Sequence, residues 1–183
     1  MKELSLNILD IAQNSIKANA SRIILKLDET DDTMQFTIED NGCGMSAEVL
    51  EKVENPFYTT RTTRAVGMGI SLFKLAAEQT GGYLKIASRW EKDYPDTHGT
   101  ELTTLFYKNH IDYAPLGDII STILFLIHGS PDIDFAFTHT VNGNTVELDT
   151  IQLRTVLEDV PLNSPEVIGW IEEFLKEHYN MIL

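Results

Sequence analysis

The chain has 183 residues, of which 43% are hydrophobic and 23% charged, a composition typical of a folded globular protein and not of a disordered one. Its longest strongly apolar stretch, residues 119–127, is much shorter than the roughly 20 residues that cross a bilayer, and the N-terminus has no secretory signal pattern. We therefore expect no membrane contact. The single cysteine, Cys43, cannot form an internal disulfide, which favours a cytoplasmic location.

The formal net charge of −14 is distributed unevenly along the chain. Residues 110–183 contain 12 acidic and 2 basic residues, whereas residues 1–109 contain 16 acidic and 12 basic residues. An acidic surface repels the phosphate backbone of nucleic acids, so we expect no nucleic-acid partner. The acidic segment has two interpretations: a solvated surface that keeps the protein dissolved, or a docking face for a basic protein partner.

Residues 1–108 show helix signals and strand signals in succession. Helices are indicated by apolar residues at helical spacing, and strands by the alternation of apolar with polar residues. Ser46 is a suitable N-cap for a short helix, and Gly81-Gly82 ends a longer one. The elements predicted in this block are a helix over 3–19, strands over 22–28 and 34–39, a helix over 47–53, a helix over 69–80, and strands over 83–89 and 101–107.

The pattern restarts after His110. Asn142-Gly143 is a strong signal for a tight hairpin turn, and Ser164 is a suitable N-cap with Pro165 at the first helical position. The elements predicted in this block are a buried helix over 116–127, strands over 134–141 and 145–149, and helices over 150–158 and 165–179. We therefore expect residues 109–183 to form a small α+β unit that packs on the first block.

Three polar residues, Asp10, Asn14 and Lys17, share one face of the first predicted helix, because they are spaced i, i+4 and i+7. A carboxylate, an amide oxygen and an ammonium on one stripe suit a metal–triphosphate group, since magnesium prefers oxygen ligands and keeps waters and phosphates in its shell. The alternative interpretation is an ordinary polar face on a surface helix.

A second polar segment, Asp40-Asn41-Gly42-Cys43-Gly44, directly follows a predicted strand. An Asp at a strand end accepts hydrogen bonds from an exocyclic amine, and two glycines allow the backbone to approach a flat ring. A plain turn is the alternative explanation of the same residues.

Two further segments suit phosphate groups. Residues 55–64 form a loop rich in hydroxyl groups that contains Arg61, and arginine pairs readily with phosphate. Val66-Gly67-Met68-Gly69-Ile70 begins a helix, where free backbone N–H groups and the helix dipole favour an anion.

In this order and spacing, the four segments resemble the ATP-binding module of the gyrase, Hsp90, histidine-kinase and MutL superfamily, the GHKL ATPases. Asp10 and Asn14 match its first box, and Gly99-Thr100 precedes the last strand as a Gly-Thr does in the family. The resemblance covers nearly all of residues 1–108. Its adenine-binding Asp-x-Gly-x-Gly box is matched by Asp40, Gly42 and Gly44, and its second glycine box by Gly67 and Gly69. The first two boxes resemble MutL, whereas the segment from Pro56 to Arg61 resembles the lid of histidine kinases and anti-sigma kinases.

The resemblance implies an α+β fold of Bergerat type, a mixed sheet backed by helices in two layers, with ATP and Mg²⁺ as ligands. It implies that Asp40 accepts a hydrogen bond from the adenine amine with Thr100 assisting through a water, and that Asn14 ligates magnesium. The nucleotide-binding residues implied are, together, Asn14, Lys17, Asp40, Gly42, Gly44, Met45, Arg61, Gly67, Met68, Gly69, Ile70 and Thr100. Asp10 is the candidate catalytic residue, because it occupies the place of a Glu that positions the attacking water in hydrolysing members.

The expected function depends on how the chain departs from these relatives. Only nine residues precede Asp10, so we expect no upstream hairpin with a phosphoacceptor histidine, and the 75 residues after the module are too few for a MutL-type transducer domain. The preferred hypothesis is a regulatory protein with a histidine-kinase-like module that phosphorylates a partner in trans. A slow ATPase clamp of MutL type and a nucleotide-binding interaction module without chemistry are the alternatives, and the sequence does not set the oligomeric state.

Overall fold

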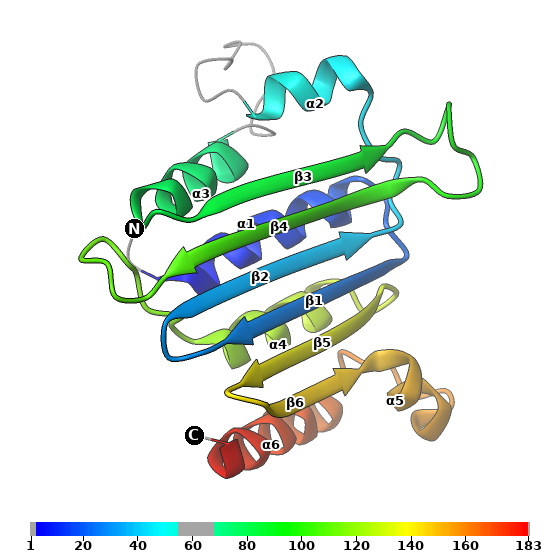
Figure 1. Ribbon diagram of the computed structural model, residues 1–183. Helices are drawn as coiled ribbons and strands as arrows, with labels where there is room; N and C mark the ends of the chain where they lie inside the picture. The colour runs from blue at the N-terminus through cyan, green and yellow to red at the C-terminus, as the bar shows by residue number, and fades with distance from the viewer. Residues whose placement is uncertain (1–2, 55–67, 183) are drawn as a thin grey trace.

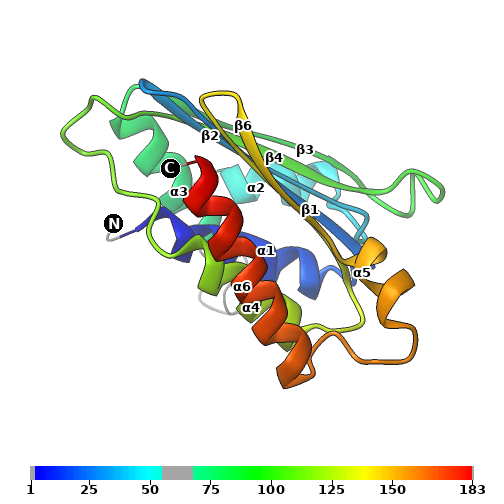
Figure 2. The same cartoon turned by 90° about the horizontal axis from the view of Figure 1, so that it is seen from below.

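The computed structural model describes residues 3–54 and 68–182. Its elements are, in chain order, α1 (Leu4–Lys17), β1 (Arg22–Glu29), β2 (Thr33–Asp40), α2 (Ala47–Glu54), α3 (Met68–Gln79), β3 (Tyr83–Arg89), β4 (Gly99–Tyr107), α4 (Ile119–Gly129), β5 (Asp134–Val141), β6 (Asn144–Asp149), α5 (Thr150–Leu157) and α6 (Pro165–Ile182). The strands form one six-stranded sheet in the order β3-β4-β2-β1-β5-β6, and α1, α3, α4 and α6 cover one of its faces (Figure 1, Figure 2). The predicted α+β fold, a mixed sheet backed by helices, is therefore confirmed.

Every predicted element is present, and the start of α4 shows how a boundary is set. The helix was expected from residue 116 but begins at Ile119, because the Asp118 side chain caps it by accepting a hydrogen bond from the Ser121 N–H at 2.9 Å. Gly117 has a φ of +78°, which ends the preceding segment in a turn. Within the described residues, no helix has both the length and the apolar character needed to cross a membrane.

The core lies between the sheet and the helices. Alternate residues of β1, namely Ile23, Leu25 and Leu27, point to the helix layer and are buried, as the period of two in a strand requires. Phe73 packs α3 against the sheet, because the centroid of the Phe73 ring lies 5.2 Å from that of Phe106 on β4. The exposed polar residues of the strands, such as Lys26, Glu39 and Glu101, lie on the opposite face of the sheet.

The C-terminal strands extend the same sheet. β5 runs parallel to β1 from the pair Arg22 and Asp134 to the pair Glu29 and Val141. The predicted hairpin between β5 and β6 is confirmed, since Asn142-Gly143 forms its turn with φ values of +47° and +89°. Residues 109–183 thus complete the sheet and the helix layer, while the division into two domains at residue 108 stays a prediction.

A buried polar cluster joins β1, β5 and α6 at the end of the sheet where β1 finishes. The ring of His139 is 2% exposed, and its Nδ1 forms a hydrogen bond with the Tyr179 hydroxyl at 2.7 Å. Its Nε2 lies 3.3 Å from Glu29 Oε2, an ion-pair distance without the alignment of a hydrogen bond. Glu29 in turn accepts a hydrogen bond from the Lys108 ammonium at 2.6 Å. Burial lowers the pKa of His139, although the Glu29 and Asp28 carboxylates oppose that shift.

We expect this cluster to make folding stability depend on pH. An unfolded histidine has a pKa of about 6.5, so below that pH the unfolded chain binds a proton that the folded chain excludes. The contribution of His139 is therefore fully present above about pH 6.5 and decreases as the pH falls toward its lowered folded pKa. The unfolding free energy, measured by urea unfolding at several pH values between 8 and 5, should depend less steeply on pH in His139→Gln than in the wild type. His128→Gln, which changes an exposed histidine, should keep the wild-type slope, and equal slopes in all three proteins would contradict the assignment.

Candidate functional site

A cavity of about 220 Å³ lies on the helix side of the sheet, between α1, the end of β2 and the start of α3. Its walls are mainly apolar, with a few polar groups directed into it, as is common for small-molecule sites. Seven residues expected from the sequence line this cavity: Asn14, Lys17, Asp40, Gly44, Met45, Ile70 and Thr100. The other lining residues are Ile11, Ser15, Ala18, Ile38, Cys43, Val53, Ile86 and Leu102. The chain thus brings together residues from three of the four sequence segments.

Asp40, the last residue of β2, is the best-anchored polar group of the cavity. Its Oδ2 accepts a hydrogen bond from the Ser15 hydroxyl at 2.6 Å, and its Oδ1 accepts one from the Gly42 N–H at 2.9 Å. A carboxylate offers about four acceptor positions, so two such bonds leave capacity for a ligand donor. The two contacts fix the orientation of the carboxylate before any ligand arrives.

Gly42 and Gly44 allow the loop after β2 to pack against its neighbours. A Cβ on Gly42 would lie 2.8 Å from the carbonyl oxygen of Ala18, at the end of α1. Gly44 has a φ of +66°, and a Cβ there would lie 2.0 Å from the carbonyl oxygen of Arg89. Side chains at either position would push the loop away from α1 or β3 and change the shape of the cavity.

A hydrogen-bonded pair of hydroxyl groups supports the cavity from β3 and β4. The Ser88 hydroxyl lies 2.9 Å from that of Thr100 and accepts a hydrogen bond from the Met45 N–H at 2.8 Å. Sequence reasoning missed both Ser88 and Ser15. Ser15 carries a signal that could have identified it, because it lies one helical turn after the buried Ile11 and a buried hydroxyl needs a partner.

The other expected site residues lie around the middle of α1 and the start of α3. Asp10 is exposed and does not line the cavity, but its Cβ would lie 3.7 Å from a Cβ on Gly69, so the two residues are neighbours. The backbone of Met68 begins α3, next to Gly69. Arg61 and Gly67 lie outside the described residues. The described part of this region therefore combines the α1 carboxylate with a helix N-terminus.

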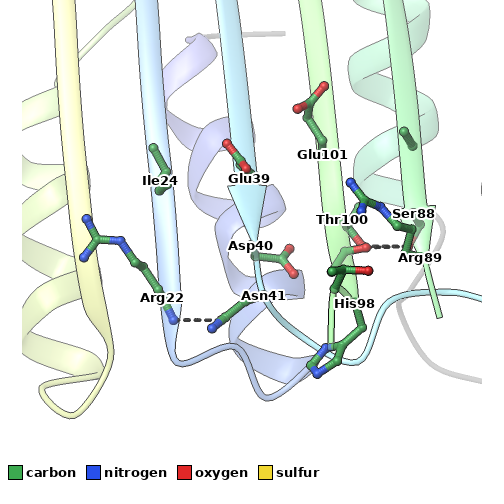
Figure 3. A pocket seen from close by; sticks show the side chains of 13 residues that line it. Arg22, Ile24, Glu39, Asp40, Asn41, Ser88, Arg89, His98, Thr100 and Glu101 are labelled. Atoms are coloured by element: carbon green, nitrogen blue, oxygen red, sulfur yellow. Dashed lines mark hydrogen bonds between the residues drawn. The ribbon is translucent and has the colours of Figure 1, made fainter. Parts of the chain in front are cut away.

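A second pocket, of about 460 Å³, opens on the opposite face of the sheet and shares Asp40 and Thr100 with the cavity (Figure 3). It is larger, but its charged groups have both signs and it lacks the apolar walls that would hold a flat ring. We therefore place the candidate site on the helix side. The residues that line the second pocket are Arg22, Ile24, Glu39, Asp40, Asn41, Ala87, Ser88, Arg89, Thr97, His98, Gly99, Thr100 and Glu101.

Solved structures share this fold. The chain is similar to the N-terminal domain of a DNA repair protein, with a TM-score of 0.51 at 17% identity over 80% of this chain and 52% of that one. It is also similar to the ATPase domain of MutL from Aquifex aeolicus, which was solved with ADP, with a TM-score of 0.50 at 13% identity over 86% of this chain and 70% of that one. At these identities the likeness concerns the fold alone.

Sequence relatives match the first part of the chain. The signal transduction histidine-protein kinase AtoS of Escherichia coli is 32% identical over 88 residues, which cover 48% of this chain and 14% of that protein. The sensor kinase CckA of Brucella abortus is 35% identical over 86 residues, which cover 46% of this chain and 9% of that protein. The chain thus matches only a small part of each relative. Residues 2–110 match the model of the family described as histidine kinase-, DNA gyrase B- and HSP90-like ATPases. Because this match spans more than half of its length, the chain belongs to that ATPase family.

Proposed function

We propose that this chain binds ATP with magnesium in the helix-side cavity. The observation that carries the proposal is the anchored carboxylate of Asp40, which lines an apolar cavity beside a loop held close by glycines. Asp40 would accept a hydrogen bond from the adenine amine, and the Thr100 hydroxyl would assist through a bound water. Met45 and Ile70 would cover the ring with apolar surface. ATP supplies a transferable phosphoryl group when it is bound.

The phosphate groups would extend from the cavity toward the start of α3. Asn14 would offer its amide oxygen to magnesium, which takes its other ligands from phosphates and water. Lys17 would contact phosphate oxygens, and Arg61, from the sequence before α3, would do the same. Gly42 and Gly44 would shape the loop beside the adenine ring. The backbone N–H groups of Gly67, Met68, Gly69 and Ile70 would hold the phosphates at the positive end of the helix dipole.

We further propose that the module is kinase-like and acts in the cytoplasm on a protein partner that docks on the C-terminal part. The relatives described as a histidine-protein kinase and a sensor kinase support this reading. A slow ATPase clamp is the second candidate, supported by the likeness of the fold to a MutL ATPase domain. Nucleotide binding without chemistry is the third.

Incubation of the purified protein with γ-labelled ATP and magnesium, first alone and then with cell lysate, separates these candidates. A kinase labels a lysate protein, an ATPase releases inorganic phosphate, and a binding module does neither. Wild-type protein and an Asp40→Asn variant should be compared at limiting ATP, because labelling that does not decrease with the weakened nucleotide affinity comes from a contaminant. Failure of the wild type to bind ATP at all would contradict the whole proposal.

If the protein hydrolyses ATP, we expect the turnover to depend on Asp10. Aspartate is one methylene shorter than the glutamate of hydrolysing relatives, and a misplacement of about 1 Å can cost about 100-fold in rate. Asp10→Asn should abolish turnover with nearly unchanged ATP affinity, whereas Asp10→Glu should raise it. A coupled phosphate-release assay measures both, with Asp96→Asn in the exposed β3–β4 loop as the matched control. Wild-type turnover in Asp10→Asn would remove Asp10 from the mechanism.

A further inference from the structure

The helix α6 has an aromatic flank that is partly exposed to solvent. This α6 aromatic flank consists of Trp170, Phe174, His178 and Met181. Trp170 and Phe174 stack with ring centroids 5.2 Å apart and an interplanar angle of 22°, and the rings of Phe174 and His178 follow at 4.0 Å. Trp170 is 50% exposed and Met181 76% exposed. Phe174 and His178 are half-buried, and Phe174 also packs against the core, so the row is partly exposed along about 16 Å of helix.

The aromatic row lies beside the buried stripe of α6. The sheet-facing stripe of the helix is buried and consists of Val167, Ile171, Leu175 and Tyr179. The helix packs next to α4, and Lys176 lies on one side of the buried stripe, paired with Glu172. At 3.6 residues per turn, Trp170 and Phe174 lie on the other side of the stripe, in a helix that packs against β6, the edge strand of the sheet. Figure 2, which looks from this edge, has α6 in front of the other helices.

Carboxylates line the outer rim of the row. Helical spacing places Glu166, Glu173 and Glu177 next to Trp170 and Phe174 on the solvent side, and all three are exposed. Within the described residues none of the three takes part in an ion pair, whereas the only lysine of α6, Lys176, pairs with Glu172. An apolar aromatic row beside unpaired carboxylates suits a partner that has apolar and cationic groups at the same spacing.

We propose that the α6 aromatic flank is the docking site for a basic amphipathic helix of a protein partner. Apolar side chains of that helix would pack against the ring row, arginine or lysine would stack on Trp170, and further cations would pair with the three glutamates. A second copy of this chain fits less well, because it would bring carboxylates against carboxylates in a protein of net charge −14. The inference rests on the protein-partner part of the proposed function and is independent of what happens to ATP.

The probe for the test is a synthetic amphipathic helical peptide with leucine on one face and arginine on the other. The full chain with Trp90→Phe leaves Trp170 as its single tryptophan, so peptide binding should shift the Trp170 emission to shorter wavelength. We expect Trp170→Ala to weaken binding about tenfold or more, as for an aromatic residue at the centre of an interface. Because this variant removes the fluorescent reporter, its affinity is measured by calorimetry. Trp170→Phe should retain most of the affinity, and thermal unfolding should be unchanged in both variants, since the side chain is half exposed.

The contribution of the α6 glutamates to peptide binding can be tested with a matched control. Glu173→Gln with Glu177→Gln should weaken peptide binding, whereas Asp93→Asn with Asp96→Asn, which removes the same charge from the β3–β4 loop, should not. Equal loss in both double variants would mean non-specific attraction and would overturn the proposal. The proposal would also be overturned if a peptide with glutamate in place of arginine bound equally well. It would be overturned too if sedimentation showed self-association of the protein that Trp170→Ala abolishes. ATP affinity should stay at the wild-type value in all these variants, while Asp40→Asn should bind the peptide normally, so this inference and the ATP site fail separately.

Discussion

Asp40→Asn is expected to weaken ATP binding by about 10- to 150-fold, because a hydrogen bond to a charged group contributes about 1.5–3 kcal/mol. The asparagine side chain keeps one oxygen and replaces the other by an NH₂ group. In the folded protein the Asp40 oxygens already accept from the Ser15 hydroxyl and the Gly42 N–H. An asparagine has too few acceptor positions to serve both of these donors and an adenine amine. Titration calorimetry on the folded variant measures the loss.

Glu39→Gln is the matched control for this prediction. It makes the same chemical change at the preceding residue of β2, whose side chain lies on the opposite face of the sheet and lines the second pocket but not the helix-side cavity. Its ATP affinity should equal that of the wild type. An Asp40→Asn variant with undiminished affinity, or a Glu39→Gln variant with an equal loss, would move the adenine site away from the helix-side cavity.

Local sequence signals predicted nearly all of the helices and strands, because the apolar residues of each element follow the period of the surface that it buries. They did not reveal which strands are neighbours. β5 pairs in parallel with β1, although about 100 residues separate them along the chain. The pattern of apolar residues within either strand does not indicate which strand is its neighbour. The cluster of His139, Tyr179 and Glu29 depends on this pairing, so no local pattern could have predicted it either.

The candidate site was predictable where its residues belong to recognisable segments. The resemblance indicated Asn14, Asp40 and Gly44, and the structure brings all three to one cavity. The supporting hydroxyl groups of Ser15 and Ser88 were not predicted, because serine is common on every surface and only the three-dimensional contacts distinguish these two. Their roles in nucleotide binding, like those of the predicted residues, stay predictions that ligand titration tests.

Phe137→Ala is expected to cost about 3–5 kcal/mol of unfolding free energy, the usual loss when a buried phenylalanine is truncated. Phe137 is 2% exposed on β5 and lies opposite Leu25 of β1, so its ring contributes to the core shared with the N-terminal block. Such a loss is a large part of the roughly 5–15 kcal/mol that stabilises a typical domain. Phe125→Ala, at a 59% exposed position on α4, serves as the control and should change stability by less than about 1 kcal/mol.

The experiment follows urea unfolding with and without ATP, because a ligand that binds only the folded state raises the midpoint of the unit that contains its site. If the C-terminal strands belong to one cooperative structure with the nucleotide site, Phe137→Ala lowers the midpoint of the single transition that ATP raises. The opposite result would be two transitions in which the one that responds to ATP keeps its wild-type midpoint in Phe137→Ala. That result would show that residues 109–183 unfold independently. The shared core between β1 and β5 leads us to expect the first result, since a gap opened beside Leu25 weakens packing on both sides of the strand pair.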